Sequence, residues 1–253
     1  MQATTHPEAE AFRIRNVPLT RPLIWLARGW QDLLDHPLPS LAYGVIVTFL
    51  GSVVLLFNHH PYLIAGSISV FLLVGPVMTA GLCELSRRRD TGEIRDFEAS
   101  LRGLRHNRVG LVGFARRLLL LSLVWMLVSS MMLHIVLGEV APSLSATVWG
   151  NVWGQLSAGQ VLSYLLVGGV LAAFVFAMSV VSVPMILDLN ADADEAIRTS
   201  WRVFWRDLPA MLVWASLIVL LVGAGFATFL VGMVFIFPWL GHATWQAYRD
   251  LVH

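Results

Sequence analysis

The chain alternates between long apolar stretches almost free of charge and shorter polar stretches that hold nearly all of its ionisable residues. Residues 36–83 and 208–248 contain no Asp, Glu or Arg, and residues 118–187 contain only Glu139. A spanning helix needs about 20 predominantly apolar residues, so each stretch is long enough for two spans. The pattern predicts an all-α, polytopic membrane bundle with about six transmembrane helices, at residues 38–57, 62–83, 118–137, 161–187, 208–223 and 226–247.

Turn residues place the divisions inside these stretches. Asn58 and Pro61 suit a tight reversal in the first stretch, and a polar loop rich in Gly and Ser divides the second. In the third we place the division at residues 223–225, which read Gly-Ala-Gly. A single long tilted helix or a re-entrant pair would also fit this last stretch, so these alternatives stay open.

All seventeen basic residues are arginines, and nine of them lie in residues 84–117, between the second and third spans. Short basic connections are kept on the cytoplasmic side of a membrane. With this connection inside, six spans bring the remaining arginines to the same side: four in the N-terminal segment, three at residues 198–206, and Arg249. The arginine distribution therefore predicts a multi-pass protein with both termini in the cytoplasm.

Each odd-numbered span follows a stretch whose apolar residues recur every three or four positions, as on one face of a helix. These positions are Leu23, Leu26, Trp30 and Leu34, then Phe97, Leu101 and Leu104, and finally Ile197, Trp201, Phe204 and Leu208. Helices with one apolar and one basic face lie in the membrane interface, so we expect amphipathic cytoplasmic interfacial helices here. Each even-numbered span contains one proline (Pro76, Pro184 or Pro238), and the whole pattern suggests three helix-pair repeats.

The composition agrees with a membrane protein. Hydrophobic residues make up 57% of the chain and charged residues 13%, which is about half the charged share of a typical soluble domain. Residues 1–16 are polar and lack periodic apolar positions, so we expect a disordered cytoplasmic N-terminus followed by a single integral membrane domain over residues 17–253. This terminus has no basic segment followed by a short apolar core, so we expect no cleavable signal peptide.

Three ionisable residues at the cytoplasmic ends of spans are the candidate functional groups, namely Glu84, Asp188 and His242. Ionisable residues within spans mark functional sites by default. A structural reading competes for each of them. Glu84 has two arginines at ion-pair spacing, three and four residues further on. Both carboxylates can reach the cytoplasmic interface, and His242 can bond a backbone carbonyl freed by Pro238.

Arginines and small residues give two further candidate contacts. Juxtamembrane arginines attract anionic lipid head groups, although they also set topology. The candidates beside the spans are Arg87, Arg88, Arg89, Arg116 and Arg117. In the fourth span, Gly169, Ala173 and Ala177 recur every four residues. This spacing is typical of close helix packing, within the chain, against a membrane protein partner or against a second copy.

Sequence patterns of catalysis and cofactor binding are missing. The chain has no phosphate-binding Gly-Lys-Ser/Thr loop, no Gly-x-Ser-x-Gly elbow and no His-Glu-x-x-His pair. His59, His60 and His134 are scattered without the spacing of a metal site, and no histidine lies mid-span as an axial haem ligand would. We therefore expect a protein that is not an enzyme and that binds no cofactor, metal or nucleic acid.

Several motifs of the chain resemble one family of bacterial membrane proteins. They are Phe-Arg-Ile-Arg-Asn-Val-Pro-Leu at residues 12–19, Trp30, Leu-Pro-Ser-Leu-Ala-Tyr-Gly at 38–44, Phe-Leu-Leu-Val-Gly-Pro at 71–76, Glu-Leu-Ser-Arg-Arg at 84–88 and Leu-Gly-His-Ala-Thr-Trp-Gln-Ala-Tyr-Arg-Asp at 240–250. The family is DUF2189, predicted integral membrane proteins that are sometimes labelled cytochrome c oxidase subunit I-like. The resemblance spans nearly the whole chain, and it implies a protein of the bacterial inner (cytoplasmic) membrane without an assigned activity.

Two functional hypotheses follow. The first is a non-catalytic inner-membrane protein with an accessory, assembly or lipid-interacting role, which the basic interfacial helices and the small-residue stripe favour. The alternative is a small-solute or ion transporter or channel, with a cavity near Glu84, Asp188 and His242. The transporter gains support if these three residues converge on one water-filled cavity. It loses support if they pair with arginines or face lipid head groups.

Overall fold

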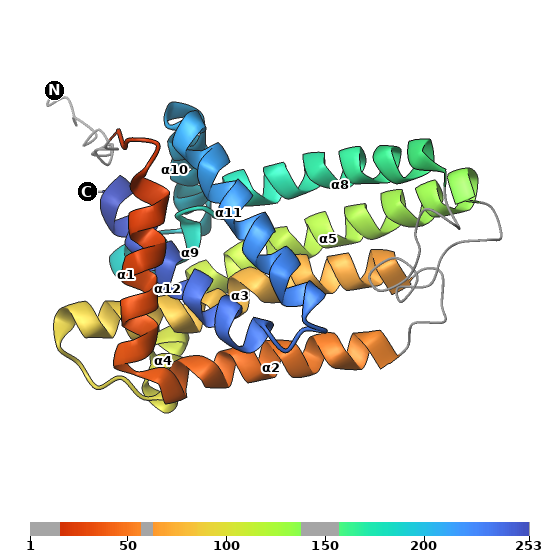
Figure 1. The fold of residues 1–253 in the computed structure, drawn as a ribbon. Helices are drawn as coiled ribbons and strands as arrows, with labels where there is room; N and C mark the ends of the chain where they lie inside the picture. The colour runs from red at the N-terminus through yellow and green to blue at the C-terminus, as the bar shows by residue number, and fades with distance from the viewer. Residues whose placement is uncertain (1–15, 57–62, 138–156, 253) are drawn as a thin grey trace, which may run out of the picture.

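The computed structural model of the chain describes residues 16–56, 63–137 and 157–252, which form helices joined by short connections. The helices, shown in Figure 1, are α1 (Arg21–Asp35), α2 (Pro37–Leu56), α3 (Leu63–Thr91), α4 (Phe97–His106), α5 (Arg108–Leu137), α8 (Ala158–Ser179), α9 (Ser182–Leu189), α10 (Ala193–Arg206), α11 (Leu208–Ala227) and α12 (Met233–Leu251). The all-α prediction is confirmed for these ranges. Nearly all of the N-terminus that we expect to be disordered lies outside the described residues, as do His59 and His60.

Four segments of the described residues are long and apolar enough to cross a membrane: Pro37–Val54, Arg108–Met132, Ala158–Leu189 and Leu208–Ala227. Helices α2, α3, α5 and α8 run side by side, and α11 crosses them obliquely (Figure 1). The prediction of an integral membrane protein with several membrane-length helices is therefore confirmed. The count of six spans and the three repeats stay predictions.

Three shorter helices, α1, α4 and α10, lie at one end of the long helices (Figure 1). Each is separated from the next long helix by one non-helical residue, namely His36, Asn107 or Asp207. At the first of these junctions the cause is visible in the sequence. Pro37 is suited to the first position of α2, and it disfavours helical backbone at the residue before it. The chain therefore turns at His36, and α1 ends at Asp35.

The regularly spaced apolar residues of α1 lie mostly on its outer face. Three of the four are exposed, namely Leu23, Trp30 and Leu34, at 54%, 39% and 59%. The helix turns Trp25 and Gly29 inward against α12. A Cβ atom at Gly29 would lie 2.5 Å from the backbone nitrogen of Ala243, so the missing side chain permits this close crossing. The exposed apolar face is left for lipid or another apolar surface.

Two helix limits differ from the predicted spans. The stretch predicted as one span at residues 161–187 is broken at Val180 and Val181, between α8 and α9. The break has a local cause, because the ring of Pro184 would clash with the carbonyl of residue 180 in a continuous helix. The division predicted at residues 223–225 lies instead at 228–232, after the end of α11.

Thr228 and two left-handed residues form this second break. The Thr228 hydroxyl donates to the Gly225 carbonyl over 2.8 Å and accepts from the Gly232 N–H over 2.8 Å. Phe229 and Leu230 have φ angles of 54° and 67°, which non-glycine residues seldom adopt and which end the helix. The glycines that suggested the earlier division remain helical, and Gly225 gives room to the start of α12.

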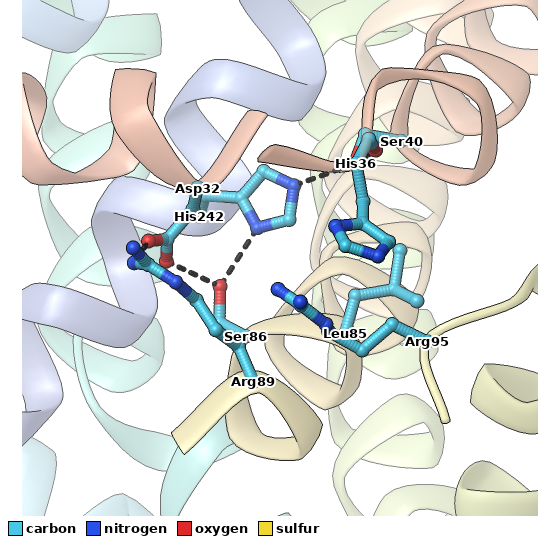
Figure 2. A pocket seen from close by; sticks show the side chains of 8 residues that line it. All are labelled: Asp32, His36, Ser40, Leu85, Ser86, Arg89, Arg95 and His242. Atoms are coloured by element: carbon cyan, nitrogen blue, oxygen red, sulfur yellow. Dashed lines mark hydrogen bonds and ion pairs between the residues drawn. The ribbon is translucent and has the colours of Figure 1, made fainter. Parts of the chain in front are cut away.

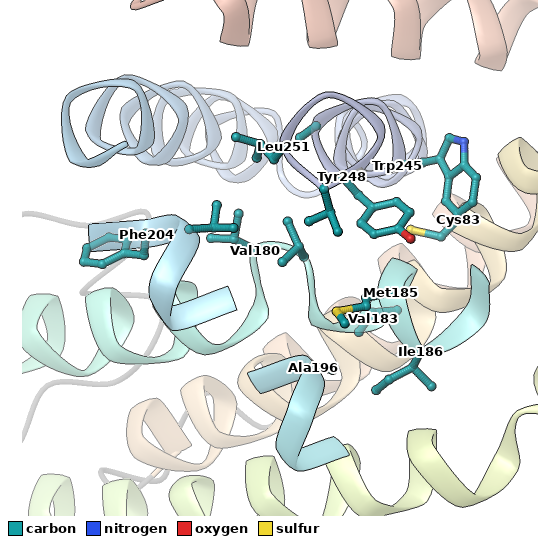
Figure 3. Close-up of a cluster of buried hydrophobic side chains, with 14 of the residues drawn as sticks. Cys83, Val180, Val183, Met185, Ile186, Ala196, Phe204, Trp245, Tyr248 and Leu251 are labelled. Atoms are coloured by element: carbon teal, nitrogen blue, oxygen red, sulfur yellow. The ribbon is translucent and has the colours of Figure 1, made fainter. Parts of the chain in front are cut away.

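The core lies where α12 packs against α1, α2 and α3. Its largest fully buried side chains include Trp25, Phe114, Trp214, Trp245 and Tyr248. Figure 3 shows apolar side chains from α9, α10 and α12 meeting in one cluster beside Cys83 of α3. Because α12 occupies the centre, the polar residues in its second half are carried into the interior of this end of the molecule.

Candidate functional site

His242 of α12 is buried, and both of its ring nitrogens have hydroxyl partners. Nε2 lies 2.9 Å from Ser40 Oγ, and Nδ1 lies 2.7 Å from Ser86 Oγ. Ser86 in turn donates to Asp32 Oδ2 over 2.9 Å. A continuous chain of hydrogen bonds therefore joins α2, α12, α3 and α1. The ring bonds side chains here, whereas the structural reading of the sequence proposed a carbonyl freed by Pro238.

The directions of these hydrogen bonds follow from the available protons. A serine hydroxyl has one proton to donate, and Ser86 gives its own to Asp32. Ser86 must then accept from the Nδ1–H of His242. The Ser40 hydroxyl can donate to Nε2 of the ring or to the His36 carbonyl, 3.0 Å away. The first arrangement fits the neutral ring, and the second fits a ring with both nitrogens protonated.

Asp32 anchors this chain from the inward face of α1. One of its oxygens accepts from Ser86 and from Gln246 Nε2, the latter over 2.9 Å, and the other pairs with Arg89. Arg89 also binds Asp35 over 2.7 Å. A buried carboxylate must be paired and hydrogen-bonded to offset the loss of hydration. Donors from α3 and α12 meet that requirement for Asp32.

A small pocket lies beside this network, at the start of α2, the end of α3 and the connection to α4 (Figure 2). It is lined by Asp32, His36, Ser40, Leu85, Ser86, Arg89, Arg95 and His242. Its volume of about 10 Å³ is roughly the space that one water molecule needs. The pocket therefore has room for a water or for one polar atom of a larger group, but not for a whole solute.

Glu84 lies apart from this pocket. Its buried carboxylate accepts from Arg87 Nε over 2.8 Å and from Arg88 Nε over 2.7 Å. These are the two arginines at ion-pair spacing in the sequence. Helix α4 covers the group so closely that a Cβ atom at Gly103 would collide with the carboxyl group. The Glu84 charge is thus neutralised within its own helix and sealed by a neighbouring one.

Asp188 takes a third, separate position. It lies exposed near the end of α9 and accepts a hydrogen bond from the Tyr248 hydroxyl over 2.8 Å. The three candidate groups therefore have separate partners, and only His242 lines the pocket.

Asp250 is a further, partly buried carboxylate that sequence reasoning did not single out. It accepts from Arg21 Nε over 2.6 Å and from Trp25 Nε1 over 2.7 Å, with Arg28 at 3.6 Å. Burial raises the pKa of Asp250, but the hydrogen bonds from Arg21 and Trp25 and the charges of the two arginines outweigh it. The pKa of Asp250 therefore lies below its usual value, and the carboxylate ties the C-terminal helix to α1.

Four of the five predicted lipid-contacting arginines are engaged in ion pairs. Arg87 and Arg88 bind Glu84 and Arg89 binds Asp32, while Arg117 binds Asp194 of α10. Arg116 is exposed and has no ion pair within the described ranges. Binding of anionic lipid by these five residues stays a prediction, and the ion pairs favour other arginines for that role.

The small-residue stripe is only partly packed. Gly169 and Ala173 are exposed on α8, and a Cβ atom at Gly169 would meet nothing within 4 Å, whereas Ala177 is buried. Packing of the exposed part against a partner or a second copy stays a prediction. Within the part of the chain that the structure describes, no three His, Cys, Asp or Glu side chains lie together as metal ligands would.

Comparison with known proteins gives a family match. Residues 63–188 match the family model described as Predicted integral membrane protein (DUF2189). The matched segment runs from the start of α3 to the end of α9, and so it includes the arginine-rich connection, Glu84 and Asp188. Neither a curated protein nor a solved structure matches the chain.

Proposed function

The chain belongs to the DUF2189 family of predicted integral membrane proteins, and we propose that it is a non-catalytic membrane component that binds anionic lipid head groups at its cytoplasmic face. The membrane is the inner membrane of a bacterium, and both termini are cytoplasmic. An accessory or assembly role for a neighbouring membrane protein is compatible with this lipid binding.

The observation that carries this proposal is a set of exposed arginines without a carboxylate partner within the described ranges. These arginines, which we call the arginine face, are Arg105, Arg108, Arg116, Arg198, Arg202 and Arg206. Those of α10 bond only neutral groups, such as the Asn16 amide oxygen for Arg206. The charges of the arginine face are therefore available to an outside anion. The ion pair between Arg117 and Asp194 joins α5 to α10, the two helices that carry most of these arginines.

Exposed aromatic rings accompany these charges on α10. Trp205 is 57% exposed, and its ring lies 5.3 Å from Phe204 and 6.1 Å from Trp201. Trp201 in turn meets the partly exposed Phe174 of α8 at 5.4 Å. Tryptophan is enriched at the level of lipid head groups. Adjacent arginines and tryptophans on a short helix that leads into an apolar span suit a position in that layer.

The contribution of the arginines to lipid affinity follows from their charge. An arginine near a membrane surface contributes about 1 kcal/mol of attraction to anionic lipid, which corresponds to roughly fivefold in affinity. Three such residues would add about 3 kcal/mol in the absence of screening. Salt reduces this attraction, because exposed charges are screened over about 10 Å at 0.1 M.

A comparison of variants in neutral detergent tests the proposal. We expect Arg198→Gln combined with Arg202→Gln and Arg206→Gln to weaken binding of phosphatidylglycerol at least about tenfold, because each substitution removes an available charge. Binding of zwitterionic phosphatidylcholine should not change. The measurement is the rise in melting temperature as each lipid is titrated at fixed salt.

Two single variants serve as the matched control. Arg116→Gln removes an exposed arginine without an ion pair, whereas Arg102→Gln removes one that lies 4.0 Å from Glu98. Arg116→Gln should weaken phosphatidylglycerol binding more than Arg102→Gln does. Wild-type binding by the triple variant would contradict the proposal.

The alternative of a small-solute or ion transporter receives less support. It requires Glu84, Asp188 and His242 to face one cavity. Glu84 is paired with two arginines, and Asp188 bonds Tyr248 elsewhere. The pocket beside His242 is the size of a single water, so it does not form a solute-sized cavity between spans.

A further inference from the structure

We propose that the pocket of Figure 2 is a binding site for one phosphate-type oxyanion, with Arg95 and His36 as its ligands. The proposal takes its class of ligand from the proposed function, but it uses none of the six residues of the arginine face.

Arg95 is the first proposed ligand, because its charge has no partner among the described residues. It lies in the connection between α3 and α4, is partly buried, and makes no ion pair or hydrogen bond to any described residue. Its neighbours at the end of α3 behave differently, since Arg88 and Arg89 each bind a carboxylate. A guanidinium presents five N–H donors in a planar fork that matches phosphate and carboxylate groups. Figure 2 shows the Arg95 side chain entering the pocket with these donors unused.

His36 supplies the second unused group at the same pocket. Its Nδ1 atom is buried and has no hydrogen-bond partner in the part of the chain that the structure describes. Buried polar atoms are nearly always hydrogen-bonded, so an orphaned one calls for a missing partner. The residue is also held in place, because Pro37 restricts its backbone and its carbonyl lies 3.0 Å from the Ser40 hydroxyl. With its proton on Nδ1, the neutral ring would donate to an anion beside Arg95.

The carboxylates near the pocket do not compete for Arg95. Asp32 is satisfied by Arg89, Ser86 and Gln246, and Asp35 binds Arg89 as well. The two carboxylates and the two arginines sum to zero charge, so a monoanion adds one negative charge to a balanced set. Its binding must come from direct hydrogen bonds to Arg95 and His36, and from partial exposure of the pocket to water, rather than from a net positive field.

The size and surroundings of the pocket indicate the class of ligand. About 10 Å³ holds one oxygen atom of a larger group, so the rest of the anion must remain outside. Exposed apolar side chains are close in sequence to both ligands: Ile94, 73% exposed, precedes Arg95, and Leu38, 82% exposed, follows His36 by two residues. A phosphate group fits the ligands, and an acyl chain suits exposed apolar side chains that are close to them in sequence. The shared chemistry is a phosphate oxygen, from a phosphodiester lipid head group or from free phosphate.

Titration of the full chain in neutral detergent tests the site. The probes are short-chain phosphatidylglycerol below its micellar concentration and inorganic phosphate, and binding is measured by isothermal titration calorimetry. Wild type should bind one tight equivalent beside the weaker binding at the arginine face, and Arg95→Gln should lower the affinity of the tight equivalent at least about tenfold, because it removes a charge-assisted pair. Arg95→Lys should fall between the two, since it keeps the charge and loses the fork. His36→Gln should also weaken binding.

The controls separate this site from the arginine face. Arg102→Gln, on the adjacent α4, should leave the single tight equivalent unchanged, because Arg102 lies 4.0 Å from Glu98 and is not part of the arginine face. The triple variant of α10 should keep this tight equivalent and lose the weaker phosphatidylglycerol binding at the arginine face. If the α10 variant alone loses lipid binding, the site proposed here is wrong while the proposed function stands. If Arg95→Gln alone loses it, the pocket stands and the arginine face is dispensable.

The two probes identify the source of the anion. Phosphatidylglycerol binding at least tenfold tighter than phosphate assigns a lipid head group, and equal affinities assign free phosphate. Wild-type affinity in both Arg95→Gln and His36→Gln, or no binding of either probe to wild type, would overturn the proposal. Arg95 contacts no described residue through a hydrogen bond, so its replacement should leave the melting temperature of the unliganded protein nearly unchanged, which shows that the variants are folded.

Discussion

Carboxylates at the end of the bundle where the short helices lie are paired mainly across helices. Asp32 of α1 binds donors from α3 and α12, Asp90 of α3 binds Trp245, and Asp188 of α9 binds Tyr248. Asp250 of α12 binds Arg21 and Trp25 of α1. Glu84 and the exposed Glu98 are exceptions, because their arginine partners lie on the same helix. Each cross-helix bond makes the position of one helix depend on another.

Asp250 offers the clearest test at the scale of one residue. We expect Asp250→Asn to lower the free energy of unfolding by about 1–3 kcal/mol, because it weakens charge-assisted bonds to Arg21 and leaves a donor poorly paired. Asp35→Asn is the control, since Asp35 is largely exposed and makes one ion pair with Arg89. Thermal unfolding in detergent measures both, and equal effects of the two variants would contradict this account.

The same carboxylate predicts a dependence of stability on pH. The pKa of Asp250 is lower in the folded protein than the usual value of about 3.9. Its contribution is therefore fully present above that usual value and is lost as the pH falls through the lower, folded-state pKa. We expect the melting temperature of wild type to drop more steeply than that of Asp250→Asn below about pH 4. Parallel curves for the two proteins in this range would show that the pairing contributes nothing.

At the scale of elements, the packing of α1 on α12 depends on one glycine. In Gly29→Ala the added Cβ would lie 2.5 Å from the Ala243 nitrogen and 2.8 Å from its Cα. Overpacking of this kind costs about 1–3 kcal/mol, so we expect a lower melting temperature and faster hydrogen exchange in residues 21–35. Gly169→Ala is the matched control, because its Cβ would meet nothing within 4 Å. An unchanged melting temperature in Gly29→Ala would show that the two helices are less closely packed than described.

The existence and order of the helices could be predicted from the sequence, because membrane-length apolar runs and flanking arginines are strong local signals. The break after Ala227 could not be placed, since it depends on Phe229 and Leu230 in an uncommon backbone conformation rather than on the nearby glycines. The break between α8 and α9 could not be placed from the sequence either. A proline inside an apolar run does not say whether it kinks a span or divides it.

The candidate site could be predicted only in part. Glu84 and its two arginines follow from spacing within one helix. The network of Asp32, Ser40, Ser86 and His242 joins four helices, and apolar periodicity does not tell which polar side chains of α1 meet the other three. Gly29, three residues before Asp32, was the available signal, because a glycine on a helix face permits close approach of another helix. Its partner on α12 could not be read from a single sequence.

At the scale of the whole molecule, the threading through the membrane remains the main prediction. Reporter fusions after residues 92 and 192 should give a cytoplasmic signal, and fusions after residues 60 and 150 should give a signal from the opposite side. The reason is that all the arginines then lie on one side. A cytoplasmic signal from the fusion at 60 or 150 would refute this topology.

The central place of α12 has a consequence for biosynthesis. Gln246 lies 214 residues after its partner Asp32, which at about 5–20 residues per second takes the ribosome roughly 10–40 s to cover. The carboxylates of α1, α3 and α9 that bond α12 each lack that donor from their own synthesis until α12 is made, over 214 residues for Asp32, 155 for Asp90 and 60 for Asp188. A nascent chain is therefore incomplete in the membrane until its final helix arrives, and a chain terminated before Met233 would leave those carboxylates and the apolar faces around them without their cover.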